Sequence, residues 1–358
     1  MTRKPPLPTD ATTFLSAVPA LLGFIPDASM ILVVLGEGTR VRVSMRCDLS
    51  LTPDGDPKDD LLAVIAELGP IVGRQCPTAV VGVIADHRFA PTDIRYRRVL
   101  TLLDASLSDW GGLAQGFVVS AFHEHAPWRL AWHSGHFATA TGLGDGVDAG
   151  VMDDPRTSPT AVAAAVSVGR RILDDRCEIA EMLAPLPHCI SAICGAALND
   201  SYSSPQQRRD DSAYLLAALL DAMDDPTRAD CTTISLLERA ITTIPVRDAA
   251  LACAVTDLRP DAEILWRVLT RRLRGCGRAS AATLLAHLHY IGGDGAYAGI
   301  ALDCALEADP DWRLAGLLDK ALRGGAQPSL LWRMIDDSLE IAADLGITLP
   351  RVTLGAVG

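Results

Sequence analysis

The stretch VMDDPRTSPTAVAAAVSVGRRILDDRCEIAEMLA, residues 151–184, separates two halves of the chain that have different patterns. Before it, strand-like apolar runs alternate with helix-like segments. After it, apolar residues recur at helical spacing and no strand-length pattern competes with them. The sequence therefore predicts an α/β domain at residues 1–152, a helical joint at residues 153–187 and an all-helical domain at residues 188–358.

Two helices are predicted within the joint, because each has its own start signal. Ser158 is a preferred capping residue, and it precedes Pro159, which suits the first position of a helix. Asp175 and Glu178 have the spacing of a capping box, which predicts a second, short helix that ends before Pro185. The alanines of the first helix suit close packing between the two halves, so we expect the joint to be structural.

The first half has the pattern of a mixed sheet with helices on it. Residues 30–35 form a continuous apolar run and residues 41–47 alternate between apolar and polar, which together predict a hairpin. Further strands are predicted at residues 78–85, 116–122 and 128–133.

Three helices are predicted between these strands and before them. The first begins behind Thr9 or Asp10 as its cap. The second is expected to begin behind Asp56 and to end at Pro70, since proline disrupts a helix interior. The third spans residues 92–110.

The second half is predicted to be helical throughout. The predicted helices lie near residues 190–197, 212–223, 232–243, 246–255, 262–273, 279–291, 297–308, 312–323 and 329–345. The segment ALEADP, residues 305–310, is an ending typical of tetratricopeptide repeats, and it places Ala298 and Ala305 where paired helices touch, with Ala286 in place of the usual glycine. The bulky aromatic positions of that repeat are not filled and no second copy follows, so one isolated repeat is predicted.

The composition indicates which partners and which location to expect for the protein. The net charge of -12 argues against general attraction to nucleic acid or to an anionic membrane, since both need a surplus of lysine and arginine. Nine cysteines without any CxxC pair favour reduced thiols. No apolar run approaches the roughly 20 residues that cross a bilayer. We therefore expect a cytoplasmic protein.

Four of the eight histidines cluster in sequence and form a metal-site hypothesis: His123, His125, His133 and His136. On a strand, the first two would share a face, and a neighbouring strand that carries His133 could bring further nitrogen ligands to a zinc ion. The spacing matches no established zinc motif, so surface or packing roles are the alternative.

Two further candidates carry charge. Asp86 and His87 follow a predicted buried strand, where α/β sheets often place ligand-binding groups; a capped loop is the alternative. Arg267, Arg271 and Arg274 recur at helical spacing, and we expect them to line one side of a helix. In an acidic protein such a stripe could bind an acidic partner or a phosphate group, although it could also be a solvated face paired with local carboxylates.

Three stretches, taken in order, carry a family resemblance. They are AVPALLGFIPDASMILVVL at residues 17–35, residues 143–185 with DDPRTSP and AAAVSVGRRIL, and residues 246–318 with VRDAAL and ALEADPDWRLAGLL. Together they cover nearly the whole chain, which resembles the actinobacterial domain-of-unknown-function 4192 family. The resemblance implies no activity, cofactor or catalytic residue.

The motifs of common enzymes are missing from the sequence. We find no G-x-S-x-G elbow, no G-x-x-x-x-G-K-[ST] loop and no H-E-x-x-H helix. The leading hypothesis is therefore a non-enzymatic protein-binding or scaffold protein that uses its helical domain to hold a partner. The alternative is an enzyme, or a sensor of a small ligand or metal, with its site at the strand ends.

Overall fold

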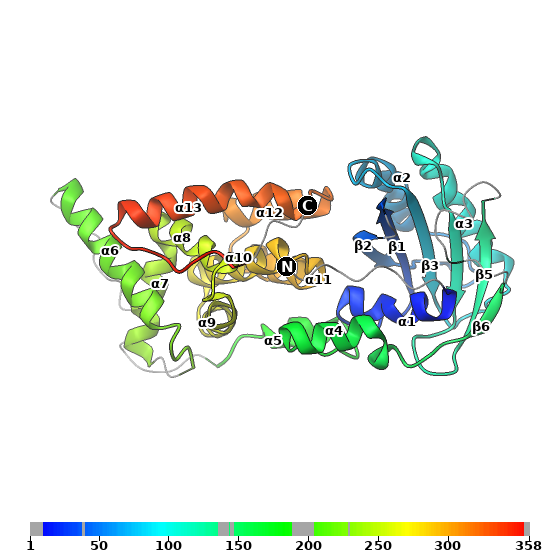
Figure 1. Ribbon diagram of the computed structural model, residues 1–358, viewed down its shortest axis with the longest axis horizontal. Coiled ribbons are helices and arrows are strands. Elements are labelled where there is room, and N and C mark those ends of the chain that lie inside the picture. The colour runs from blue at the N-terminus through cyan, green and yellow to red at the C-terminus, as the bar shows by residue number, and fades with distance from the viewer. Residues whose placement is uncertain are drawn as a thin grey trace. The chain divides into compact units, whose positions relative to one another are not determined.

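The chain folds into two compact units, Thr2–Arg176 and Cys177–Gly358, which we call the α/β unit and the helical unit (Figure 1). The computed structural model describes residues 10–37, 40–134, 143, 147–187, 204–227 and 230–353. The predicted fold class, a mixed sheet with helices followed by an all-helical part, is confirmed. Among the described residues, none of the helices has both the length and the apolar character that crossing a bilayer requires.

A six-stranded sheet forms the centre of the α/β unit, in the order β2-β1-β3-β4-β5-β6. The strands are β1 (Ser29–Gly36), β2 (Arg40–Asp48), β3 (Ala79–Ala85), β4 (Gln115–Val119), β5 (Pro127–His133) and β6 (Ala149–Val151). Strands β3 and β4 are parallel and the other neighbours are antiparallel, so the predicted hairpin of β1 and β2 is confirmed. The short strand β6 was not predicted.

Helices cover both faces of this sheet (Figure 1). They are α1 (Ala11–Leu22), α2 (Asp59–Gly73) and α3 (Ile94–Ser106), and a further helix, α4 (Pro159–Val168), packs against α1. Helices α2 and α3 pack against alternate residues of β1, β3 and β4 and form the main core of the unit. On the opposite face, Phe14 of α1 packs against Phe117 of β4, with ring centroids 6.3 Å apart.

The helix starts in this unit test the capping predictions. Asp10 caps α1, since its side chain accepts a hydrogen bond from the Thr13 amide at 2.8 Å. The predicted start of α2 behind Asp56 is wrong, because Pro57 pairs with Leu51 in a β-bridge and the helix begins at Asp59. The predicted end at Pro70 is also wrong, because the helix continues to Gly73.

The two helices predicted in the joint are confirmed. Helix α4 begins at Pro159, and the Ser158 hydroxyl accepts a hydrogen bond from the Ala161 amide at 3.3 Å. Helix α5 (Cys177–Met182) is the predicted short second helix. Helix α4 packs against α1 in the α/β unit, whereas α5 packs against α11 in the helical unit.

The helical unit is built around α10, whose residues are buried from Gly277 to Ile291. The α-helices of this unit are α5, α6 (Pro205–Asp221), α7 (Cys231–Thr242), α8 (Ile244–Ala250), α9 (Arg259–Arg272), α10 (Gly275–Ile291), α11 (Gly295–Ala308), α12 (Arg313–Arg323) and α13 (Trp332–Asp344). Helices α10 and α11 form the predicted pair, with Ala286, Ala298 and Ala305 fully buried. The helix predicted near residues 190–197 lies outside the described residues.

Candidate functional site

The carboxylate of Asp86 lies inside a polar cluster at the end of β3, where it is 0% exposed. The guanidinium of Arg88 donates from Nε to both carboxylate oxygens, each at 3.0 Å. The hydroxyl of Tyr96 donates to Oδ2 at 2.9 Å. Arg88 also donates from Nη2 to the carbonyl of Leu49 at 3.0 Å. The buried charge is therefore paired and hydrogen-bonded within the chain.

The phenol of Tyr96 acts as a hydrogen-bond donor in this cluster. Burial raises the pKa of Tyr96 well above its usual range, and the hydrogen bond to Asp86 acts in the same direction. The phenol therefore stays protonated near neutral pH, where a general acid or base would need a pKa close to that of the medium. These contacts make the cluster suited to holding the loop between β3 and α3 in place.

His87, the other residue of the predicted ligand site, points into a different environment. Its side chain is 69% exposed, and Nδ1 lies 3.4 Å from the Asp27 carboxylate. The Asp86 side chain next to it is fully buried. The structure therefore does not bring the two side chains together in one site.

The three described histidines of the metal hypothesis lie at opposite ends of β5. His123 and His125 are in the loop between β4 and β5, so the condition for a shared face, that both lie on a strand, is not met. His133 ends β5, and a strand of this length separates it from that loop by roughly 20 Å. His136 lies outside the described residues. Within the described part of the chain, no three His, Cys, Asp or Glu side chains are grouped to hold a metal ion.

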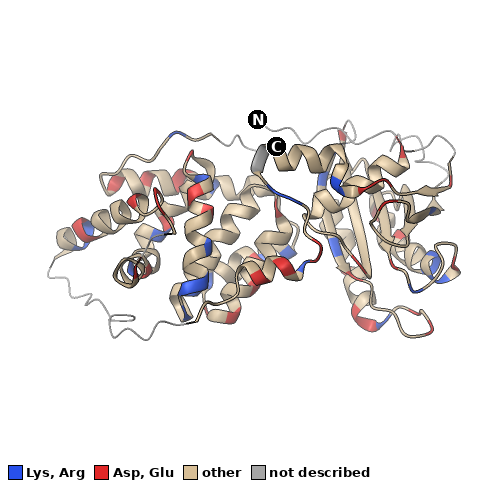
Figure 2. Ribbon diagram, turned by 90° about the horizontal axis from the view of Figure 1, so that it is seen from below, with Lys and Arg blue, Asp and Glu red and all other residues tan. Residues whose placement is uncertain are grey.

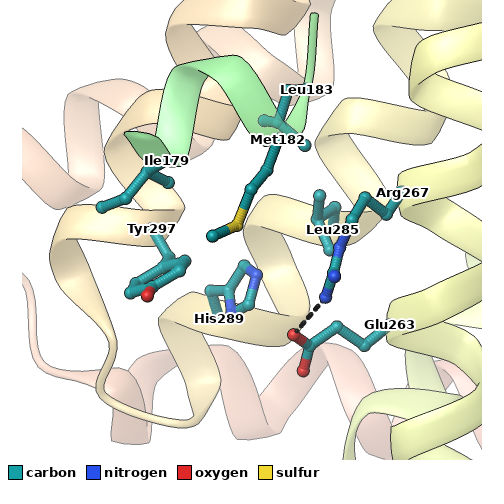
Figure 3. A pocket seen from close by; sticks show the side chains of 8 residues that line it. All are labelled: Ile179, Met182, Leu183, Glu263, Arg267, Leu285, His289 and Tyr297. Atoms are coloured by element: carbon teal, nitrogen blue, oxygen red, sulfur yellow. Dashed lines mark hydrogen bonds and ion pairs between the residues drawn. The ribbon is translucent and has the colours of Figure 1, made fainter. Parts of the chain in front are cut away.

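A pocket opens in the helical unit between α5, α9, α10 and α11 (Figure 3). Its lining residues are Ile179, Met182, Leu183, Glu263, Arg267, Leu285, His289 and Tyr297. The pocket has a volume of about 20 Å³. That is room for about one water molecule, far below the size of a cofactor or drug-like ligand.

One side of this pocket is polar and the other is apolar. Arg267 and Glu263 lie one turn apart on α9 and form an ion pair at 3.0 Å. The rings of His289 and Tyr297 lie beside each other, with centroids 5.2 Å apart. From the other side, Met182 extends out of α5 toward His289 (Figure 3). A flexible thioether at this place suits a surface that adapts to what it contacts.

The pocket lies beneath a segment of the chain that is laid on the helical unit. This segment, residues 177–186, consists of α5 and the extended residues after it, and we call it the strap. Ile179 and Leu183 are its buried anchors, at 2% and 5% exposure, and they are four positions apart. Most of the other strap residues are exposed. An amphipathic helix that lays two apolar residues into a groove has this pattern.

Three arginines hold the backbone of the strap. Arg278 donates from Nη2 to the carbonyl of Leu183 at 3.1 Å, and Arg271 donates from Nε to the carbonyl of Ala184 at 3.3 Å. Arg274 donates to the carbonyl of Leu186. The Leu186 amide in turn donates to the carbonyl of Arg271 at 2.9 Å. The extended end of the strap is thus held through its main chain.

The predicted arginine stripe on one helix is wrong in its geometry. Helix α9 ends at Arg272, and Leu273 and Arg274 have extended backbone between it and α10, for which Arg274 is the N-cap residue. Arg267 is paired with Glu263. Arg271 and Arg274 instead contact the strap. Binding of an outside partner by these arginines stays a prediction.

Sequence reasoning did not assign the strap or Arg278 to a binding surface. The capping-box spacing at Asp175 predicted α5 itself, because that signal is local. Its docking on α9, α10 and α11 depends on contacts between residues about 90 positions apart. No local pattern in the sequence records such contacts.

The fold and its surfaces define a class: a protein with a mixed-sheet α/β unit followed by an all-helical unit, whose helices hold an internal strap. Residues 12–329 match the model of the family described as Domain of unknown function (DUF4192). The chain belongs to this family, so the resemblance seen in the sequence is confirmed. No curated protein and no solved structure matched the chain.

Proposed function

We propose that the protein is a binding protein whose helical unit holds a short segment of a protein partner. One observation carries this proposal: the surface of α9, α10 and α11 already holds such a segment, the strap, by two apolar anchors and by main-chain hydrogen bonds. Helix-in-groove binding uses the same contacts between two chains. The proposal thus extends to a partner the binding that this surface already performs within the molecule.

The other properties of the proposed partner follow from charge and composition. Acidic residues are spread over the helices and loops of both units (Figure 2), and the net charge is -12. A protein segment is therefore a better partner than a nucleic acid. The cysteine pattern of the sequence supports a cytoplasmic location for the proposed complex.

The alternative, an enzyme or a ligand sensor at the strand ends, has weaker support. Asp86 is fully buried and is hydrogen-bonded to Arg88 and Tyr96. A group that takes a substrate or ligand needs an open position beside it. Zinc at the histidine loop also has weaker support, because His133 lies at the far end of β5 from His123.

The test compares a variant of the pocket with a variant elsewhere in the helical unit. Partners are captured from the native host with the full chain, identified by mass spectrometry, and then purified to measure their affinity. We expect Arg267→Glu with Tyr297→Glu to weaken a true partner by at least about tenfold, or 1.4 kcal/mol. Arg333→Glu on exposed α13 is the matched control and should leave the affinity unchanged.

Two results would overturn this function. In one, every captured partner binds the pocket variant and the wild type equally. In the other, no protein is enriched above a mock capture although circular dichroism shows that the full chain is folded. Either result would remove the helical surface as a partner site.

A further inference from the structure

Few side chains of the strap take part in the contacts that hold it. The three arginines bond to main-chain carbonyls, and every peptide carries such carbonyls. Only Ile179 and Leu183 are buried as anchors. A segment from another protein with two apolar residues at the same spacing would therefore meet the same surface with the same contacts.

The helical form of the strap depends on this surface. Helix α5 has six residues, and helices shorter than about 12 residues are marginal in water on their own. Its order therefore comes from docking of Ile179 and Leu183 on the helical unit. A segment that is ordered only by docking loses its helix when it leaves, so undocking is a local unfolding of a few residues and does not require the whole unit to unfold.

The strap also leaves part of the surface unmatched in charge. Among the described residues, no carboxylate forms an ion pair with Arg271, Arg274 or Arg278. The strap residues at Arg271 and Arg274 are Ala184, Pro185 and Leu186, and none of their side chains is charged. Both arginines are half-buried, so a carboxylate at this place could reach them.

The strap leaves space in the pocket as well. The volume beside Met182 is about 20 Å³, and it is bounded by Leu285, His289 and Tyr297. A larger apolar side chain at the position of Met182 would fill this volume and contact those residues. A segment with a larger apolar side chain at the position of Met182 and a carboxylate near the arginines would therefore pack and pair better on this surface than the strap does.

We propose that the strap is a displaceable internal ligand, and that the partner it gives way to is an acidic peptide segment. Such a segment forms one or two helical turns, carries apolar residues at the positions of Ile179 and Leu183, and has a carboxylate beside Arg271 and Arg274. This inference rests on the proposed function, because it names the partner and the regulation of the same surface. The unbound protein holds its own site closed, and only a segment that pairs with the arginines opens it.

The test uses two labelled synthetic peptides and the full chain. The first peptide has the sequence of residues 175–187, with serine in place of Cys177; the second also has aspartate in place of Ala184 and glutamate in place of Leu186. Binding is measured by fluorescence anisotropy to the wild type and to a chain with Ile179→Ser and Leu183→Ser, which weakens the strap by removing its apolar anchors without adding charge beside the arginines. Removing the internal competitor should tighten binding of both peptides by at least about tenfold.

The charge on the second peptide supplies an independent comparison. It should bind the strap-weakened chain about fivefold or more tighter than the first peptide, in line with a gain near 1 kcal/mol from new charge pairs. Adding Arg271→Gln and Arg274→Gln should erase this difference. Equal binding of both peptides would overturn the acidic preference, and equal binding to the wild type and the strap-weakened chain would overturn displacement.

A second measurement covers the case in which the strap-weakened chain fails to fold. Hydrogen exchange of the Leu186 amide, which bonds to the carbonyl of Arg271, is followed in the wild type while the acidic peptide is added. Exchange should speed up as the peptide saturates the protein, and unchanged exchange at saturation would overturn displacement. Failure of partner capture with success here would instead count against the proposed function alone.

Discussion

Two arginine clusters in this protein are built in different ways. In the α/β unit, Arg88 meets the buried carboxylate of Asp86 and the phenol of Tyr96 lies on the same oxygen. In the helical unit, Arg271 and Arg274 meet neutral main-chain carbonyls, among them those of Ala184 and Leu186 in the strap. The first cluster pairs a positive charge with a negative one. In the second cluster, the positive charges are hydrogen-bonded to main-chain carbonyls, which every peptide has.

This difference separates a structural cluster from a binding surface. Removing one member of a buried charge pair leaves the other uncompensated, so breaking the pair of Asp86 and Arg88 should lower the stability of the fold strongly. Removing a carbonyl from a half-exposed arginine lets water take its place at small cost. Stability should therefore depend strongly on the first cluster and weakly on the second.

The largest effect is expected when the charge pair is broken from the arginine side. Arg88→Met leaves the Asp86 carboxylate buried with Tyr96 as its remaining side-chain donor, and should lower the free energy of unfolding by about 3–5 kcal/mol. Urea denaturation followed by circular dichroism measures the loss. Arg98→Met is the matched control in the same unit, because its pair with Asp56 is exposed, and it should cost less than about 1 kcal/mol.

A loss below about 1 kcal/mol in Arg88→Met, equal to the control, would contradict the comparison. It would mean that Asp86 finds water or another donor when the arginine is gone. The end of β3 would then be open enough for the ligand-site alternative to regain support.

A buried histidine adds a pH dependence to the helical unit. His287 on α10 is fully buried, and neither ring nitrogen has a hydrogen-bond partner among the described residues. Burial, with a smaller contribution from the charge of Arg259, lowers the pKa of His287 to about 4 from the ordinary 6.5. Between pH 6.5 and 4, His287 therefore binds a proton in the unfolded chain but stays neutral in the folded chain.

The sign follows from this uptake, because acid favours the state that binds the proton. The contribution of neutral His287 is fully present above pH 6.5 and is lost as the pH falls toward 4, by about 3 kcal/mol in all. Urea denaturation of the wild type and of His287→Leu at pH 7 and pH 4 measures it. The stability of the variant should fall less over this range, and equal falls would show that His287 does not titrate with folding.

The start of α4 and the start of α2 show how far local signals reach. Both carry a capping residue followed by proline, and the signal at Ser158 and Pro159 correctly placed α4. At Asp56 the same signal failed, because the Asp56 carbonyl closes a turn with the Thr52 amide at 2.8 Å and Pro57 joins a β-bridge. A cap signal is decisive only where no other hydrogen bonds compete for the same residues.

Pairings between distant residues were the part that could not be predicted. The alternation of strands and helices gave the α/β unit, and helical spacing gave the second half. The short strand β6 was missed because its three residues are defined only by pairing with β5. The strap was missed for the same reason. In the sequence, the arginines that hold it have the spacing of a solvated helix face, and only the fold brings the carbonyls of Leu183 and Ala184 beside them.

A smaller effect is expected when the phenol of the first cluster is removed. Tyr96→Phe keeps the ring but takes away the donor to Asp86, whose charge is still paired with Arg88. The free energy of unfolding should fall by about 1.5–3 kcal/mol, the range for a hydrogen bond to a charged group. Chemical denaturation at pH 7 measures this loss, and a neutral outcome would show that the phenol adds nothing to the cluster. Tyr214→Phe on exposed α6 is the control.

The smallest effect on stability is expected for the strap, and it gives the most direct test of the difference between the two arginine clusters. Arg274→Met removes the donor to the Leu186 carbonyl and to the carbonyls of Arg271 and Leu273, contacts that water can replace, so the free energy of unfolding should fall by only about 0.5–1 kcal/mol. The local consequence is clearer, because the Leu186 amide is protected only while the strap is docked. Its hydrogen exchange should speed up about twofold to fivefold in the variant, while amides of α10 keep the wild-type rate. If the amides of Leu186 and α10 instead change together, the strap opens only when the whole unit unfolds, and the two arginine clusters would be alike in function despite their different chemistry.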